Sequence, residues 1–179
     1  MTWDDGDSSM KIYLLRHGKA EDPESVGGSD KARRLTDIGI QETEVSARAI
    51  ERMQVCPEVI WTSPYPRAAQ TAEIVADRLG LGERLRQIEV LEPGARPEPV
   101  MEMVESANRE QSVMLVGHNP DLETLLAYLV SKDGSAKIKL KKGALAFLEA
   151  KGPLKAGSGK LMGLWTVQDL HKLLGGAGE

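Results

Sequence analysis

The sequence predicts an α/β protein: a three-layer α/β/α sandwich around a mostly parallel central sheet. Two observations lead to this prediction. Short apolar runs with the length of buried strands alternate with segments of helical periodicity through four successive units. Such an alternation is typical of parallel sheets whose two faces are both covered by helices.

Length and composition fit an ordinary globular protein. The chain has 179 residues, of which 41% are hydrophobic and 28% charged, enough for one domain with a sizeable core. We expect a flexible tail over residues 1–9 and a single domain over residues 10–175.

Charge and cysteine content narrow the possible partners and location. The formal net charge of −4 gives no overall field that would attract nucleic acid or an anionic membrane. The first residues lack the basic and apolar regions of a secretory signal, and no apolar stretch reaches the roughly 20 residues of a membrane helix. The single cysteine, Cys56, excludes an internal disulfide and fits a reducing compartment. We therefore expect a cytoplasmic protein that binds neither nucleic acid nor membrane.

The first unit begins with an apolar run at Lys11–Leu15, which we expect to be a buried strand. A loop rich in Gly, Ser and Asp follows over residues 22–34. Thr36 is a good N-cap for a helix that extends to about Met53. Its apolar positions at helical spacing predict the buried face: Ile38, Val45, Ala49 and Met53.

The second and third units repeat the pattern. A strand at Glu58–Thr62 leads into prolines that suit the first turn of a helix, and that helix stops at Gly80. A third strand at Leu85–Leu91 precedes a helix that starts at Pro97.

The fourth unit and the end of the chain complete the sheet. The fourth strand is Ser112–Val116, and Asn119 and Pro120 suit the N-cap and first position of the next helix. Apolar runs at Ala144–Ala150 and Met162–Val167 predict a hairpin at one sheet edge. A short helix, Asp169–Leu174, closes the fold.

Cationic and imidazole side chains follow three of the four predicted parallel strands. Arg16 and His17 come after the first strand, Arg67 after the second and His118 after the fourth. Because the carboxyl ends of parallel strands share one edge, these residues should line one crevice. Two arginines and two histidines in one crevice favour binding of an oxyanion, most readily a phosphate.

At this point four motifs, LLRHGKA, RRLTDIG, SPYPRAAQTA and VGHNPDLE, together resemble the histidine phosphatase superfamily with its phosphoglycerate-mutase-like fold. The short chain looks most like the SixA-type phosphohistidine phosphatases, and the resemblance spans about Met10 to Val167. It implies that His17 is the phosphorylated histidine and that Arg16, Arg67 and His118 form the phosphate pocket. There is room for a single helix between Glu92 and Ser112, so the lid of larger relatives is not expected.

These residues suit nucleophilic catalysis on phosphorus, which depends mostly on positioning and electrostatics. We expect His17 to attack through a neutral ring nitrogen while a backbone carbonyl holds its other nitrogen. Arg16 and Arg67 would orient the phosphoryl group, and His118 would donate a hydrogen bond to it. No metal and no cofactor are predicted.

The remaining candidates have weaker support. Gly18, Asn119 and Arg33 are candidate substrate-binding residues beside the main motifs. Glu92 follows the third strand, where relatives carry a proton donor, but a solvated loop carboxylate is an equal alternative. Imidazole leaves more readily than an alkoxide, so a pocket without a firm acid favours phosphohistidine.

The predicted function is hydrolysis of protein-borne phosphohistidine through a phosphohistidine intermediate on His17. The alternatives are a phosphatase acting on a small sugar, nucleotide or polyphosphate substrate and a non-catalytic module that binds phosphorylated ligands. The partner is thus a phosphorylated protein or a small phosphorylated molecule. Lysines at 137, 139, 141 and 142 either steer an acidic partner or protect a solvated edge strand.

Overall fold

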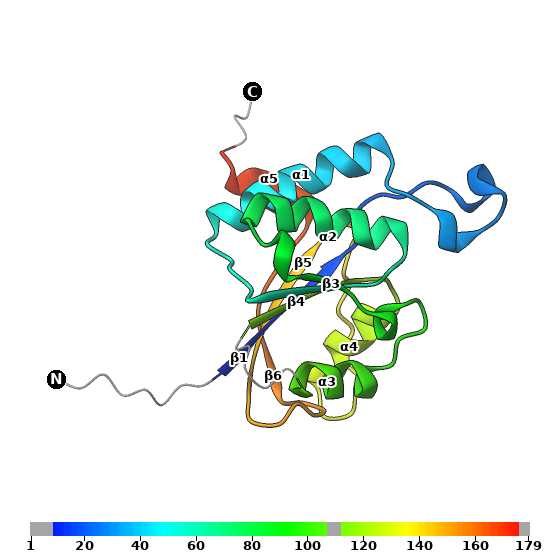
Figure 1. Cartoon of the computed structure of the whole chain (residues 1–179). Helices are drawn as coiled ribbons and strands as arrows, with labels where there is room; N and C mark the ends of the chain where they lie inside the picture. Colours follow the sequence, from blue (N-terminus) through cyan, green and yellow to red (C-terminus); the bar gives the residue numbers. More distant parts are fainter. Residues whose placement is uncertain (1–8, 107–111, 176–179) are drawn as a thin grey trace.

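The computed structural model describes residues 9–106 and 112–175 of the chain, arranged as one central sheet with helices on both faces (Figure 1). The sheet has six strands in the order β3-β2-β4-β1-β5-β6. β1 to β4 pair in parallel, and β5 and β6 complete one edge as an antiparallel hairpin. The strands are β1 (Ser9–Arg16), β2 (Val59–Thr62), β3 (Leu85–Gln87), β4 (Ser112–Gly117), β5 (Leu145–Lys151) and β6 (Gly159–Trp165). This confirms the predicted α/β/α sandwich.

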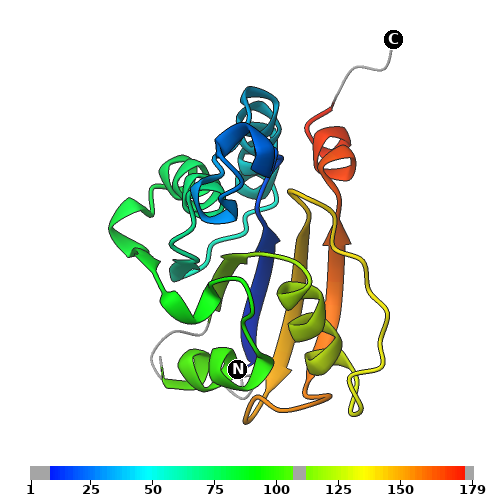
Figure 2. The same cartoon turned by 90° about the vertical axis from the view of Figure 1, so that its right-hand side faces the viewer.

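The helices form the two outer layers. α1 and α2 lie on one face of the sheet, with α5 packed against α1, and α3 and α4 lie on the other face (Figures 1 and 2). No helix in the described part of the chain is long and apolar enough to cross a membrane. The helices are α1 (Asp37–Arg52), α2 (Pro66–Leu79), α3 (Pro97–Ser106), α4 (Asp121–Val130) and α5 (Val167–Leu173).

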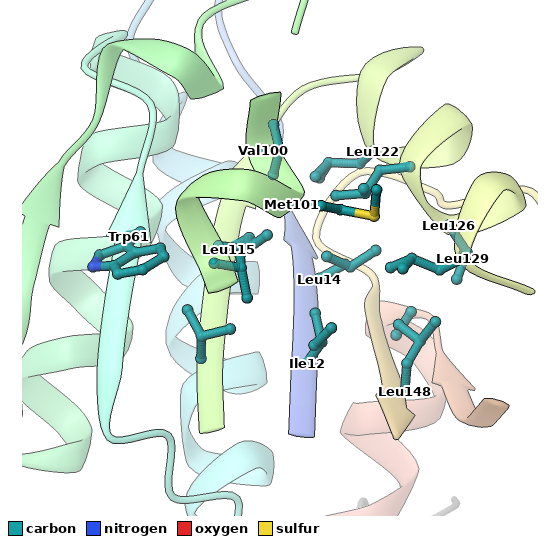
Figure 3. Close-up of a cluster of buried hydrophobic side chains, with 14 of the residues drawn as sticks. Ile12, Leu14, Trp61, Val100, Met101, Leu115, Leu122, Leu126, Leu129 and Leu148 are labelled. Atoms are coloured by element: carbon teal, nitrogen blue, oxygen red, sulfur yellow. The ribbon is translucent and has the colours of Figure 1, made fainter. Parts of the chain in front are cut away.

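The core lies on both sides of β1, because successive side chains of a strand point to opposite faces. Ile12 and Leu14 join the cluster under α3 and α4, which also contains Leu126 (Figure 3). Tyr13 and Leu15 join the cluster under α1 and α2. Burial on both faces explains why β1 reads as a continuous apolar run, and it fixes the point at which the strand emerges at Arg16.

The buried face of α1 agrees with the prediction only in part. Ala49 is buried and Met53 packs against the core as expected, whereas Ile38 is 52% exposed. The packed face also carries small or polar residues that a hydrophobic pattern does not mark: Gly39, Thr43, Ser46 and Ala47.

β3 is shorter than expected. It ends at Gln87, and residues Glu89–Leu91 form a 3₁₀ turn. The ladder between β2 and β3 ends at the pair Thr62–Gln87. Beyond it, Leu91 turns into the core beside α3.

Two expected boundaries also move. Ser9 is already part of β1, while residues 1–8 of the expected tail lie outside the described residues. Asn119 does not cap α4: the helix begins at Asp121 after Pro120, and the Asn119 side chain bonds elsewhere.

Candidate active site

The structure brings the predicted strand-end residues together at the carboxyl edge of the sheet. Arg16 ends β1, Arg67 follows β2 and His118 follows β4. Because β4 lies between β1 and β2 in the sheet, His118 comes from the strand between the other two. The His17 backbone N–H donates to the Gly117 carbonyl at 3.1 Å. The rings of His17 and His118 have centroids 5.2 Å apart.

His17 is held as a neutral imidazole. Its Nδ1 lies 2.7 Å from the Gly18 carbonyl oxygen, which can only accept a hydrogen bond, so Nδ1 carries the proton and Nε2 keeps its lone pair. This is the backbone carbonyl contact expected from the sequence. Burial lowers the pKa of His17 to about 3 against the opposing effect of the Gly18 hydrogen bond, and His118, Arg67 and Arg16 lower it further.

The turn after His17 is tightly packed. The Gly18 N–H donates to Thr71 Oγ1 at 3.1 Å, so both backbone polar groups of Gly18 are engaged within the protein. A Cβ on Gly18 would lie 2.7 Å from Thr43 Oγ1, and one on Gly39 would overlap the Lys19 carbonyl oxygen. The close approach of α1 to this turn therefore requires glycine at both positions.

Arg16 is anchored through one arm of its guanidinium. Its NH1 donates to the Leu140 carbonyl at 3.0 Å, while its Nε is buried and has no partner among the described residues. The Leu140 N–H donates to Glu123 Oε1 at 2.8 Å. Burial lowers the pKa of Arg16, and the Glu123 carboxylate opposes that shift.

Arg67 is almost completely buried and pairs with Asp30, which the sequence analysis did not single out. The two guanidinium arms donate to the Asp30 backbone carbonyl at 2.7 Å and to its Oδ2 at 2.9 Å. Arg33 donates to the other carboxylate oxygen at 2.9 Å. Arg33 thus reaches Arg67 through Asp30, and the Nε of Arg67 has no partner among the residues that the structure describes.

His118 is oriented by Ser63, a second residue that the sequence analysis did not assign. His118 Nε2 lies 2.8 Å from Ser63 Oγ, and the same oxygen accepts from the Tyr65 N–H at 3.2 Å. His118 Nδ1 is buried without a partner in residues 9–106 and 112–175. Burial and the nearby Arg67 lower the pKa of His118 to about 4, although Asp30 opposes the shift.

Asn119 and Glu92 have different surroundings. Asn119 Nδ2 donates to the Leu140 carbonyl at 2.9 Å, and its Oδ1 is buried and unpaired. Glu92 ends the 3₁₀ turn after β3 and is half-buried. Its carboxylate makes no hydrogen bond or ion pair within the described ranges.

Residues 131–143, which link α4 to β5, run beside α4 as irregular chain rather than as an edge strand (Figure 2). A groove separates them from one face of the helix. Its wall includes Pro120 just before α4, Glu123 and Ala127 on α4, and Lys137, Ile138 and Lys139 on the linking segment. Lys137, Lys139, Lys141 and Lys142 are all exposed.

The chemistry of the site follows from its unpaired atoms. Arg16, Arg67 and His118 all lower the pKa of His17, whose Nε2 keeps its lone pair, and each has a buried nitrogen without a partner in the described chain. Such a set can bind a tetrahedral oxyanion and present a nucleophile to it. Within the described residues, no group of three His, Cys, Asp or Glu side chains is placed to hold a metal ion.

Comparisons with known proteins agree with this geometry. Residues 12–92 match the family model of the histidine phosphatase superfamily (branch 1). The phosphohistidine phosphatase SixA of Escherichia coli is 30% identical over 125 residues, which are 69% of this chain and 73% of that protein.

Solved structures extend the match over most of the chain. A SixA protein histidine phosphatase complexed with tungstate superposes with a TM-score of 0.79 at 26% identity, over 90% of this chain and 99% of that one. A SixA structure from Agrobacterium tumefaciens gives a TM-score of 0.72 at 27% identity, over 88% and 97%. The chain therefore belongs to the histidine phosphatase superfamily, as a SixA-type phosphatase.

Proposed function

We propose that this phosphatase removes phosphoryl groups from phosphohistidine on other proteins, through a covalent phosphohistidine intermediate on His17. The observation that carries the proposal is the set of unpaired buried donors. Arg16 Nε, Arg67 Nε and His118 Nδ1 are removed from water without a hydrogen-bond partner in the described chain. Unmade hydrogen bonds of this kind cost about 1–3 kcal/mol each, more for charged groups, so a phosphoryl group that fills them all binds favourably.

His17 acts as the nucleophile in this proposal. The Gly18 carbonyl holds Nδ1–H, so Nε2 directs its lone pair at phosphorus. As the new P–N bond forms, the bond to the leaving group breaks and its electron pair departs with that group. Water then attacks the phosphorylated His17 and releases inorganic phosphate, which restores the neutral imidazole.

The arginines and His118 stabilise the charge on the transferring group. Arg16 and Arg67 each keep a free Nε–H beside arms that are already anchored, so their guanidinium planes are fixed before substrate arrives. Ser63 can donate its hydroxyl proton to His118 Nε2, because it accepts from Tyr65 with its oxygen. His118 Nδ1 then carries a proton and points a donor at the phosphoryl group.

Two observations support a phosphoramidate on a protein rather than an ester on a small molecule. Glu92 is the candidate proton donor for an alkoxide, and no hydrogen bond or ion pair with the described residues holds its carboxylate in place. The segment with the four exposed lysines flanks the site, since Leu140 within it binds the Arg16 guanidinium. Those lysines form a cationic surface suited to an acidic partner, although the whole chain is acidic.

The decisive experiment follows the phosphoryl group. The protein is mixed with a carrier protein that bears phosphohistidine, quenched without acid and read by intact mass. We expect the wild type to gain one phosphoryl group and then release phosphate, whereas His17→Ala gains none.

Arg78→Met is the matched control, because Arg78 pairs with Glu51 on the exposed surface of α1 and α2. This variant should label as the wild type does. Labelling of His17 by p-nitrophenyl phosphate or a sugar phosphate, but not by the carrier, would overturn the proposed substrate and support His17 as the nucleophile. Labelling of His17→Ala would overturn the nucleophile.

A further inference from the structure

Four buried side-chain atoms at the site have no partner in the described chain, and Asn119 Oδ1 is the one that can only accept a hydrogen bond. Asn119 Nδ2 donates to the Leu140 carbonyl oxygen at 2.9 Å. A carbonyl can only accept, so this bond fixes which end of the amide is nitrogen and which is oxygen. The Oδ1 of Asn119 is buried and makes no hydrogen bond with the described residues. A buried acceptor without a partner is unfavourable, and it therefore indicates a ligand that donates.

The amide lies beside the proposed phosphoryl site. The Leu140 carbonyl accepts from both Asn119 Nδ2 and Arg16 NH1, at 2.9 and 3.0 Å. The Asn119 amide and the Arg16 guanidinium therefore lie next to each other on the same carbonyl oxygen. Asn119 also directly follows His118 in the chain. The deprotonated phosphoryl oxygens are acceptors too and cannot satisfy Oδ1, whereas an N–H on the leaving group of the substrate can.

Phosphohistidine supplies such a donor. When its ring is protonated, one nitrogen carries phosphorus and the other carries a proton. Only from this form does the ring depart as neutral imidazole; the unprotonated form would have to depart as a strongly basic anion. The lone pair of His17 Nε2 forms the new P–N bond, the electron pair of the old one goes to the departing ring, and each ring keeps its remaining N–H.

We propose that Asn119 Oδ1 accepts a hydrogen bond from the free ring N–H of the substrate phosphohistidine, and so selects phosphoramidates over phosphate esters. The inference rests on the proposed function. It gives the transfer a matching acceptor on each side: the Gly18 carbonyl for the ring of His17, and Asn119 for the departing ring. A phosphate ester has no N–H at the position of that ring nitrogen and leaves the Asn119 acceptor without a partner, so the contact favours cleavage of the phosphoramidate.

The test compares two small substrates, phosphoimidazole and p-nitrophenyl phosphate. Asn119→Leu has nearly the shape of asparagine without its acceptor, and Asn119→Asp keeps an acceptor. Both lose the Nδ2 bond to Leu140, so their difference isolates Oδ1. We expect the ratio of kcat/KM for phosphoimidazole to that for p-nitrophenyl phosphate to fall about tenfold in the leucine variant, the effect of one hydrogen bond. The aspartate variant should keep the ratio within about threefold.

The pH profile gives an independent measurement. For phosphoimidazole, the descending limb of kcat reports the ring proton of the bound substrate. It should move to lower pH in Asn119→Leu, because the acceptor that stabilises that proton is lost. Asn119→Ala serves the same comparison if the leucine variant does not fold.

The outcomes separate this inference from the proposed function. An unchanged substrate ratio and an unchanged descending limb in the leucine variant would overturn the role of Asn119 and leave the phosphohistidine proposal intact. A wild type that hydrolyses p-nitrophenyl phosphate but not phosphoimidazole would overturn the proposed substrate itself.

Discussion

At the scale of single residues, the site keeps two imidazoles neutral by burial. His17 and His118 are 6% and 3% exposed, and their pKa values fall to about 3 and about 4. For His17 this preserves the lone pair that attacks phosphorus in the proposed mechanism. For His118 it means that the cationic form is disfavoured, because Arg67 and Arg16 already supply positive charge nearby. A bound phosphoryl dianion reverses that balance.

Burial of both histidines makes stability depend on pH. In the unfolded chain each titrates near the ordinary histidine pKa of about 6.5. The unfolded state therefore takes up protons that the folded state refuses, so stability is full above about pH 6.5 and falls as the pH decreases. We expect the free energy of unfolding to drop by about 2 kcal/mol per histidine between pH 7 and pH 5.

Urea unfolding at pH 7, 6 and 5 measures this loss. His17→Gln should lose a visibly smaller amount than the wild type over that range, because one of the two buried imidazoles is gone. His171, exposed on α5, offers the control substitution His171→Gln. Equal pH dependence in His17→Gln and the wild type would contradict the expected burial effect.

At the scale of elements, the contact between α1 and the turn after β1 positions the nucleophile. The backbone N–H of Thr36 donates to the Lys19 carbonyl at 3.0 Å, and Gly39 packs directly against the same carbonyl. Thr36 also caps the helix, accepting from the Gly39 N–H at 3.0 Å. Helix start and catalytic turn are therefore one packed unit.

Gly39→Ala tests this unit. Alanine normally favours a helix by about 1 kcal/mol over glycine, but here its methyl group would overlap the Lys19 carbonyl. We expect a net loss of about 1–3 kcal/mol in the free energy of unfolding and a lower kcat, measured by urea unfolding and by turnover of p-nitrophenyl phosphate.

Gly82→Ala is the comparison. A Cβ on Gly82 meets nothing closer than an Asp77 carboxylate oxygen at 3.9 Å, and Gly82 does not have a positive φ. Its substitution should change neither stability nor turnover by much. A Gly39→Ala protein as stable as Gly82→Ala would show that α1 can move away from the turn without cost.

Local sequence pattern predicted most elements, and its errors have physical causes. Strand runs and caps such as Thr36 are local signals, and they were placed within a few residues. Ala49 was placed correctly on the packed face of α1, but Ile38 was not: closeness to the Lys19 turn selects small residues at that end of the helix, and Ile38 faces solvent. Asn119 has the chemistry of a cap, but the distant Leu140 carbonyl binds it instead.

At the scale of the whole molecule, the sheet order assembles the site. His17, Arg67 and His118 are distant in sequence and become neighbours because β4 lies between β1 and β2. The sequence alone predicted this gathering, since any parallel sheet aligns its carboxyl ends. It did not predict Asp30 or Ser63. An aspartate in a polar loop and a serine before a turn carry no local sign of which distant side chain they will meet.

The unfilled anion site predicts how the folded protein responds to an oxyanion. A tetrahedral oxyanion such as tungstate should raise the melting temperature of this protein, because the proposed pocket, with its buried donors on Arg16, Arg67 and His118, exists only in the folded state. At 100 times its dissociation constant a ligand adds about 2.7 kcal/mol to the free energy of unfolding.

Thermal unfolding with and without tungstate tests this response. Arg67→Met should lose most of the increase, whereas Arg78→Met, altered far from the pocket, should keep it. An increase in Arg67→Met equal to that of the wild type would place tungstate elsewhere on the molecule.

In the segment between α4 and β5, the bonds that hold the site and the exposed lysine side chains involve different residues. Its backbone is fixed at Leu140, whose carbonyl holds Arg16 and Asn119 and whose N–H is held by Glu123. The lysine side chains on either side of Leu140 point to solvent and take no part in those bonds. Substitution of the lysines should therefore change the proposed partner recognition without moving the backbone that holds Arg16 and Asn119. A library varied at these lysines would seek new protein partners while keeping the proposed catalytic centre unaltered.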